Sequence, residues 1–196
     1  MSDISPAGYP ALHVPRSPSA NREGPSRGGG LSIVYHESVI RRHRLTNEFR
    51  PSTCELQLVR VCSSQSLAYA VFHIYRPQWM STVPAFTDEL ADMIAKFAAK
   101  VNDHVIISGD LNCPATDSSH IDDHLSTVFD SFGLSELVCT PTQDDNLLDV
   151  LVSSRPSAFC DVRVTDAGLV SDHRLVTASL QCRPMKVKTS YSSRNI

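Results

Sequence analysis

The sequence lacks the features that would place it in a membrane or direct it out of the cell. No apolar run approaches the roughly 18 residues that a membrane-spanning helix needs. The first residues contain neither the basic segment nor the apolar segment of a secretory signal peptide. We therefore expect an intracellular protein that does not bind a membrane, in either the nucleus or the cytoplasm.

Closely spaced cysteine pairs are also absent. Basic residues are absent from a long stretch of the chain. The six cysteines form no Cys-x-x-Cys pair, which argues against a zinc site and fits a reducing compartment. Residues 101–150 contain ten Asp and Glu but no Lys or Arg, while the whole chain has a net charge of −3. This charge gives no case by itself for nucleic-acid binding. The acidic stretch would repel a phosphate unless a cation were bound there, and solvated loops and helix faces are the plainer interpretation.

What is present is typical of one α/β domain. A length of 196 residues and an apolar content of 41% suffice for a single buried core. Residues 1–30 contain five Pro, five Gly and five Ser, and are predicted to form a flexible arm or loop. We expect the folded domain at 31–182 and a disordered tail at 183–196.

Hydrophobic periodicity predicts the main elements of this domain. Two β-rich runs, 54–62 and 66–75, are separated by a short polar break and predict an antiparallel hairpin. Apolar residues at helical spacing predict helices over 83–101 and 118–132. The first helix leads into an apolar strand at 104–109, which favours an α/β architecture. Further short strands are expected at 31–35, 134–139, 147–152, 160–165 and 174–181.

The sharpest chemical signal follows the strand at 104–109. Asp110 and Asn112 emerge there with one residue between them, and open sheets place ligand groups at the carboxyl ends of strands. A carboxylate and an amide in this position can activate a water and hold a phosphate oxygen. An Asx turn that ends the strand is the structural alternative.

Two further signals involve a carboxylate and a histidine. Asp172 and His173 are adjacent before a predicted strand and can supply a metal ligand and a proton donor. Asp149 interrupts an apolar strand, where a buried carboxylate needs a partner such as a histidine. A fourth signal, Tyr75-Arg76, places a phenol and a guanidinium at a strand end, although an interface aromatic and a surface arginine would look the same.

A zinc site is a weaker alternative. His120 and His124 lie four residues apart on the second predicted helix, but Ile121 stands where a metalloprotease has Glu. Both histidines flank the apolar face of that helix, so we expect them to be polar side chains beside the core.

Taken together, the motifs occur in a specific order. Tyr-Arg-Pro at 75–77 precedes Gly-Asp-Leu-Asn at 109–112, Pro-Thr at 141–142 and Ser-Asp-His at 171–173. This order resembles the endonuclease/exonuclease/phosphatase superfamily, and more closely the endonuclease domain of non-LTR retrotransposon polyproteins. The resemblance covers about residues 6–182. It implies a four-layer α/β sandwich of the DNase-I-like type, truncated at its N-terminus so that the first strands are missing.

The resemblance also implies a role for each matching residue. Asp110 would orient or deprotonate the attacking water, and Asn112 would stabilise the pentacovalent phosphate. His173, held by Asp149, would protonate or stabilise a phosphoryl oxygen. Tyr75 would form a hydrogen bond to the phosphate.

Metal and substrate ligands follow in the same way. Asp172 and Asp110 would hold Mg²⁺ or Mn²⁺, and Arg76 and Asn146 are expected to bind the substrate. Gln78 stands where the retroelement domain has Pro, a difference expected to affect only the turn.

One departure from the family bears on activity. The metal-ligating Glu of the family lies upstream of the Pro/Gly-rich stretch, and no Glu in residues 1–30 stands at a predicted strand end. We therefore expect the principal magnesium ligand to be absent and the cation to be held weakly. Losing one oxyanion stabiliser alone costs about 3–4 kcal/mol, so we expect a weak or inactive nuclease.

Two functions from different classes remain. The first is Mg²⁺-dependent phosphodiester hydrolysis on DNA, in a chain that belongs to a longer polyprotein with a reverse-transcriptase domain. The second is a catalytically inactive remnant that binds nucleic acid or a partner. A lipid or inositol phosphatase of the same superfamily is disfavoured by the retroelement-like Gly-Gly-Gly segment at 28–30 and Pro-Thr segment at 141–142. The oligomeric state is not predicted by the sequence.

Overall fold

A mixed five-stranded sheet is the centre of the computed structural model, which describes residues 7–16, 30–36, 49–62, 68–98, 103–116 and 120–181. The strand order is β3-β4-β5-β7-β6. β4 and β5 pair in parallel, and the other neighbours pair antiparallel. The strands are β3 (Glu55–Cys62), β4 (Ala68–Tyr75), β5 (His104–Asp110), β6 (Ser135–Glu136) and β7 (Asp149–Ser153).

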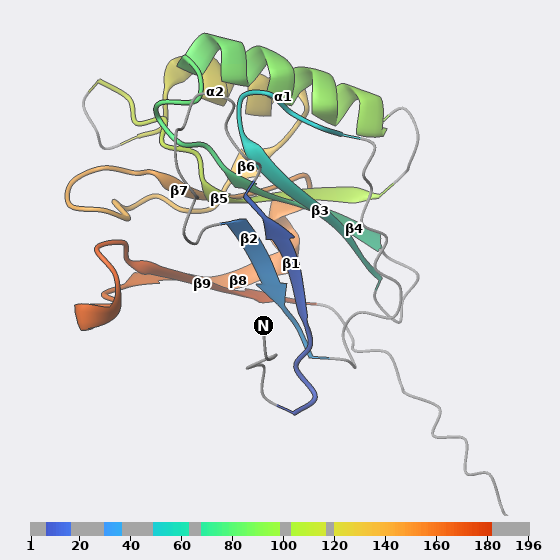
Figure 1. Ribbon diagram of the computed structural model, residues 1–196, viewed down its shortest axis with the longest axis vertical. Helices are drawn as coiled ribbons and strands as arrows, with labels where there is room; N and C mark the ends of the chain where they lie inside the picture. The colour runs from blue at the N-terminus through green and yellow to red at the C-terminus, as the bar shows by residue number, and fades with distance from the viewer. Residues whose placement is uncertain are drawn as a thin grey trace, which may run out of the picture.

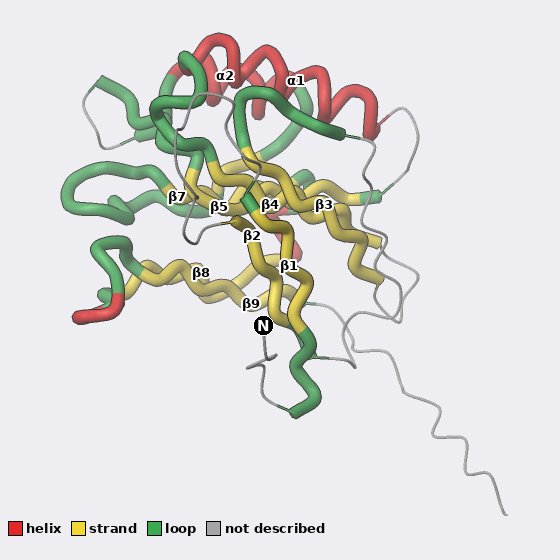
Figure 2. Tube along the Cα trace, in the orientation of Figure 1, coloured by secondary structure: helices red, strands yellow, loops and turns green. Residues whose placement is uncertain are grey.

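The described residues form three layers, with the sheet in the middle (Figures 1 and 2). Helices α1 (Val83–Ala98) and α2 (Asp123–Ser131) cover one face. Two separate antiparallel pairs, β1-β2 and β8-β9, lie on the other face. Their bounds are Ala11–Pro15 for β1, Gly30–Val34 for β2, Phe159–Thr165 for β8 and Leu175–Leu180 for β9, with single 3-10 turns at Pro156–Ala158 and Gly168–Val170.

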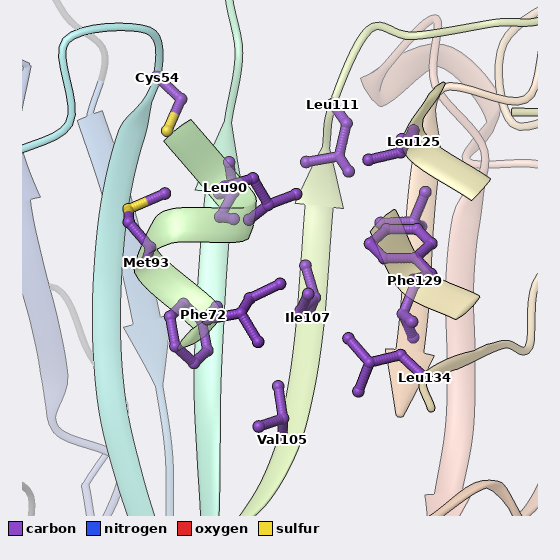
Figure 3. Close-up of a cluster of buried hydrophobic side chains, with 14 of the residues drawn as sticks. Cys54, Phe72, Leu90, Met93, Val105, Ile107, Leu111, Leu125, Phe129 and Leu134 are labelled. Carbon is purple, nitrogen blue, oxygen red and sulfur yellow. The ribbon is translucent and has the colours of Figure 1, made fainter. Parts of the chain in front are cut away.

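The main core fills the space between the helices and the sheet (Figure 3). Because side chains alternate along a strand, every second residue of β4, β5 and β7 points to the helices. Phe72, Ile107 and Val152 are each 0% exposed there, and they pack with α1 and α2 through Leu90, Met93, Leu125 and Phe129. None of the described helices has the length and apolar character needed to cross a membrane.

Most elements agree with the sequence-based expectations. The predicted hairpin is present as β3 and β4, paired from Glu55 opposite Tyr75 to Cys62 opposite Ala68. The first helix ends near its predicted position. The second begins at Asp123, five residues later than predicted, because the Asp122 carboxylate caps it by accepting from the amide of His124.

One expectation about the N-terminal region needs correction. Residues 1–30 were expected to be a flexible arm, but Ala11–Pro15 forms β1 and pairs with β2. Gln57 on β3 donates from Nε2 to the carbonyl oxygen of Leu12 at 2.9 Å, which ties this pair to the central sheet. The high content of Pro, Gly and Ser favoured a loop in the prediction. Leu12 and Val14 nevertheless alternate with other residues as apolar side chains do in a strand. Residues 17–29 and the predicted tail at 183–196 lie outside the described residues.

Glu136 on β6 is a buried carboxylate in an unfavourable environment. It pairs with Val152 in the strand register, which places its side chain on the helix face of the sheet. Its Oε1 atom is buried and has no hydrogen-bond partner among the described residues. Burial raises the pKa of Glu136 from 4.5 to about 7.

We expect Glu136→Gln to stabilise the protein at alkaline pH and to leave it nearly unchanged at acidic pH. The raised pKa means that the folded state prefers protonated Glu136, so the cost of ionisation is absent below about pH 4.5 and grows as the pH rises to about 7. The variant should gain about 1–3 kcal/mol in the free energy of unfolding at pH 8. Urea denaturation at pH 4.5 and 8 measures this, with the exposed Asp130→Asn on α2 as the control. An equal gain at both pH values would contradict the explanation.

Candidate active site

Three polar residues share one end of the central sheet, on the face opposite the helices. Asp110 ends β5 and Asp149 begins β7, and the strand register places them directly opposite each other. Tyr75 ends β4, and the amide of the following Arg76 donates to the carbonyl oxygen of Asp110 at 2.9 Å. The loops that leave β4 and β5 and that enter β7 and β9 gather at this end, on the left in Figure 1. The sheet therefore brings together residues that are far apart in the sequence.

Gly109 allows the backbones of β4 and β5 to approach closely beside this site. Its φ is +126°, a conformation that residues with a side chain rarely adopt. A Cβ atom at this position would lie 2.0 Å from the carbonyl oxygen of Ile74. The close approach requires glycine and fixes where Asp110 leaves the strand.

Asn112 holds the carboxylate of Asp110. Its backbone amide donates to Oδ1 of Asp110 at 3.0 Å, and its Nδ2 donates to Oδ2 at 2.9 Å. The same Nδ2 donates to the carbonyl oxygen of Arg76 at 3.0 Å. Both side-chain hydrogens of Asn112 are thus engaged. As placed, this amide orients Asp110, and its expected contact with a phosphate stays a prediction.

The environment of Asp110 changes its acidity. Burial and then the negative charge of Asp149 raise the pKa of Asp110 from 3.8 to about 6. A general base works best with a pKa near the operating pH. Asp110 is therefore better suited to accept a proton from water than an exposed aspartate would be.

Asp149 and His173 form a close pair. His173 Nδ1 lies 2.7 Å from Asp149 Oδ2. Burial alone would lower the pKa of His173, but the hydrogen bond and the charges of Asp149 and Asp110 outweigh it, and the net shift is upward. The sequence predicted this partnership, and the structure places both residues beside Asp110. The pair leaves Nε2 as the ring nitrogen that is able to meet a substrate oxygen.

Thr142 positions this pair, although the sequence had suggested no role for it. Thr142 is 0% exposed, and its hydroxyl accepts from the backbone amides of Leu148 and Asp149 at 3.1 and 3.0 Å. Its carbonyl oxygen accepts from the amide of Arg174 at 2.6 Å, next to His173. Thr142 thus fixes the positions of both partners, and only its place in the Pro-Thr motif pointed to it.

Arg76 differs from the expectation of a substrate ligand. It is 3% exposed, and its guanidinium donates to the carbonyl oxygens of Leu111, Asn112 and Ser81 at 2.9, 2.7 and 2.8 Å. It also lies over the ring of Phe86, 5.7 Å from the centroid. Because all of these contacts are internal, Arg76 is a positioning residue that holds the loop after β5.

Three other residues lie around the site with different surroundings. Gln78 was expected to affect only its turn, but its Nε2 donates to Oδ1 of Asn112 at 3.2 Å. Tyr75 is half-buried, with the guanidinium of Arg16 5.4 Å from its ring centroid. Asn146 exchanges backbone hydrogen bonds with Gln143 in the loop before β7. Contacts of Tyr75 and Asn146 with a substrate stay predictions.

The metal ligands are less well gathered than the other residues. Asp172 is exposed and accepts from Nε2 of Gln143 at 2.8 Å. Within the described ranges, no group of three or more His, Cys, Asp or Glu side chains is arranged to hold a metal ion. The alternative zinc pair gains no support, because His120 precedes α2 and is exposed, as is His124.

Comparison with known families decides the relationship. A family model described as endonuclease-reverse transcriptase matches residues 69–177, more than half of the 196 residues. The chain belongs to this family. The resemblance seen in the sequence motifs is thereby confirmed, and all the candidate site residues lie within the matched range. No curated protein matches the sequence significantly.

Several solved structures share this fold. The endonuclease domain of TRAS1, a telomere-specific non-LTR retrotransposon, matches with a TM-score of 0.60 and 15% identity over 91% of this chain and 80% of that domain. The catalytic domain of Xenopus laevis APE2 matches with a TM-score of 0.60 and 14% identity over 94% and 79%. Human Nocturnin matches with a TM-score of 0.57 and 17% identity over 88% and 73%. The expected α/β fold of the endonuclease/exonuclease/phosphatase superfamily is confirmed, although the described residues form three layers where four were expected.

Proposed function

We propose that this protein hydrolyses phosphodiester bonds in DNA at the site formed by Asp110, Asp149 and His173. The observation that carries the proposal is the 2.7 Å contact between His173 Nδ1 and Asp149 Oδ2, directly beside Asp110 in the strand register. An oriented histidine and a second carboxylate are what a hydrolytic attack by water requires. Membership in the endonuclease-reverse transcriptase family supports nucleic acid as the substrate.

In this mechanism, each residue has a separate task. Asp110 accepts a proton from water as the water oxygen forms a bond to phosphorus and the ester bond to the leaving oxygen breaks, and the leaving oxygen takes up a proton from solvent. Asn112 keeps the Asp110 carboxylate in place. His173, whose pKa is raised by its contact with Asp149, donates from Nε2 to a phosphoryl oxygen. Tyr75 stands at the adjacent strand end, where its hydroxyl would bind the phosphate.

The carboxylates at this site fit a divalent cation, but they supply only the smallest number of protein ligands that such a cation takes. Asp110 and Asp149 place like charges on adjacent strands, a repulsion that a cation would relieve. We assign Asp110 and Asp172 as the residues that would hold Mg²⁺ or Mn²⁺, which when bound neutralises charge on the phosphate. Magnesium prefers about six oxygens, with one or two carboxylates from the protein. Because Asp172 is exposed and engaged by Gln143, and no group of three or more ligating side chains is gathered among the described residues, we propose weak cation binding and slow hydrolysis.

A second candidate function is binding of nucleic acid or another partner without hydrolysis. The observation that favours it is that Asn112 directs both amide hydrogens to Asp110 and Arg76. An amide engaged in this way contributes nothing to a charged transition state. In either case we propose that the chain works beside a reverse-transcriptase domain, as the family description suggests.

Nicking of supercoiled plasmid DNA by the full chain tests the proposal. We expect slow nicking with Mg²⁺ or Mn²⁺ and none with EDTA. Asp110→Ala should reduce nicking to background. The matched controls Asp130→Ala and His124→Ala change exposed residues on α2, in the helix layer, and should nick like the wild type.

The outcomes separate the two candidate functions. Nicking that persists in Asp110→Ala would come from a contaminant or another site, and would refute the assignment. Absence of nicking by the wild type, together with retained DNA binding in a mobility-shift assay, would favour the binding function.

A further inference from the structure

Trp79 is an exposed aromatic residue in the loop that follows β4. It is the only tryptophan in the chain, and its side chain is 55% exposed. It occupies the turn that follows β4, between Pro77 and Met80, where the amide of Met80 donates to the carbonyl oxygen of Pro77 at 3.0 Å. The indole is therefore carried at the tip of a tight turn.

This turn is anchored to the residues that orient Asp110. Arg76, which precedes it, binds the carbonyl oxygen of Ser81, which follows it, at 2.8 Å. Gln78 donates to Oδ1 of Asn112 at 3.2 Å, and Asn112 in turn holds Asp110. Trp79 is thus adjacent to a residue in contact with the candidate site. Binding there would require little ordering of the loop, because both of its ends are already fixed.

The chemistry around the site favours contact through a base over contact through many phosphates. Asp144, Asp145, Asp166 and Asp172 are all exposed in the loops that enter β7 and β9. These carboxylates oppose close approach of a phosphate backbone. An aromatic ring can hold a nucleic-acid strand by stacking on a base, an interaction that needs no positive charge on the protein.

We propose that Trp79 stacks on an unpaired base of the nucleic-acid strand and thereby holds that strand against the candidate site. The inference rests on the proposed function and specifies its substrate as a strand with a base free to leave the duplex stack. Trp79 is a substrate-binding residue in this account, because its ring carries no group that takes part in the hydrolysis.

The fluorescence of the single tryptophan tests the proposal directly, without any catalysis. The wild-type chain is titrated in EDTA with oligothymidylate of about 16 nucleotides, the upper end of common single-strand site sizes. A second titration uses a strand of equal length whose residues are all abasic, and a third uses a blunt duplex. We expect saturable quenching with the first strand, little with the duplex and none with the abasic strand. Equal quenching by the normal and abasic strands would overturn the proposal.

Binding of a fluorescently labelled oligothymidylate to variants provides the second measurement. We expect Trp79→Leu to weaken the affinity roughly 5- to 150-fold, the range for loss of one stacked base, and Trp79→Phe to recover most of it. Val34→Ala is the matched control. Val34 is an apolar side chain as exposed as Trp79, at 57%, and it lies at the end of β2, outside the loop that carries Trp79. An unchanged affinity of Trp79→Leu would refute the inference.

The nicking assay keeps this inference separate from the proposed function. If the wild type shows quenching and Trp79→Leu binds more weakly, but the wild type does not nick DNA, then the stacking role of Trp79 is supported and hydrolysis is rejected. Nicking by the wild type with no response of Trp79 to the oligonucleotide would do the reverse. With active protein, Trp79→Leu should raise KM and leave kcat within a few-fold of the wild type.

Discussion

Asp149→Ala and His173→Ala are each expected to lower the rate of plasmid nicking by about 10²- to 10⁴-fold, the usual contribution of a positioned acid or base. The double variant should lose little more than the more damaging single variant. The reason is the 2.7 Å contact between the two side chains, through which Asp149 acts by holding the ring of His173 and its charge. Residues that act as one unit give strongly non-additive losses. Initial nicking rates of the four proteins form the required cycle.

Two further variants make this prediction specific. Asp149→Asn keeps the size of the side chain but removes its charge, so it should lower the pKa of His173 and narrow the pH range of activity from the alkaline side. Asp130→Ala removes an exposed carboxylate from α2, in the helix layer, and should nick like the wild type. If the losses in Asp149→Ala and His173→Ala multiply in the double variant, the two residues act independently and the pairing has no part in the reaction.

The sequence was most informative where local pattern and tertiary structure agree. The β3-β4 hairpin and the helix beginning near residue 83 follow from periodicity, since their apolar residues form one buried face. The need of Asp149 for a partner follows from the cost of leaving a carboxylate unpaired in an apolar strand, and the family resemblance identified that partner as His173. In each case one local property determines the result.

The sequence failed where long-range contacts decide the role of a residue. Arg76 follows a strand end that was expected to be exposed. Its guanidinium instead donates to the carbonyl oxygens of Ser81 and of two residues more than thirty positions away in the sequence. The contact of Gln78 with Asn112 depends on the parallel pairing of β4 with β5. The Pro-Thr motif marked Thr142, but it did not indicate that its hydroxyl would accept from the amide of Asp149. Periodicity describes which face of an element is buried, and it does not describe which loops meet.

Gly109→Ala is expected to destabilise the fold by roughly 3–5 kcal/mol, a large part of the 5–15 kcal/mol that stabilises a typical domain. The new methyl group would lie 2.0 Å from the carbonyl oxygen of Ile74, and a φ of +126° is unfavourable for alanine even without that contact. Since the obstacle is the backbone of the neighbouring strand β4, no side-chain rotation can relieve it. Urea denaturation followed by far-UV circular dichroism measures the loss.

Gly133→Ala is the matched control for this effect. Gly133 also has a positive φ, +62°, at the end of α2, but a Cβ atom there would meet nothing within 4 Å. We expect a loss of only about 1 kcal/mol from backbone conformation. The difference between the two variants isolates the contact with Ile74. Similar losses would show that the backbones of β4 and β5 can move apart at this point, so that the contact with Ile74 adds little to the cost.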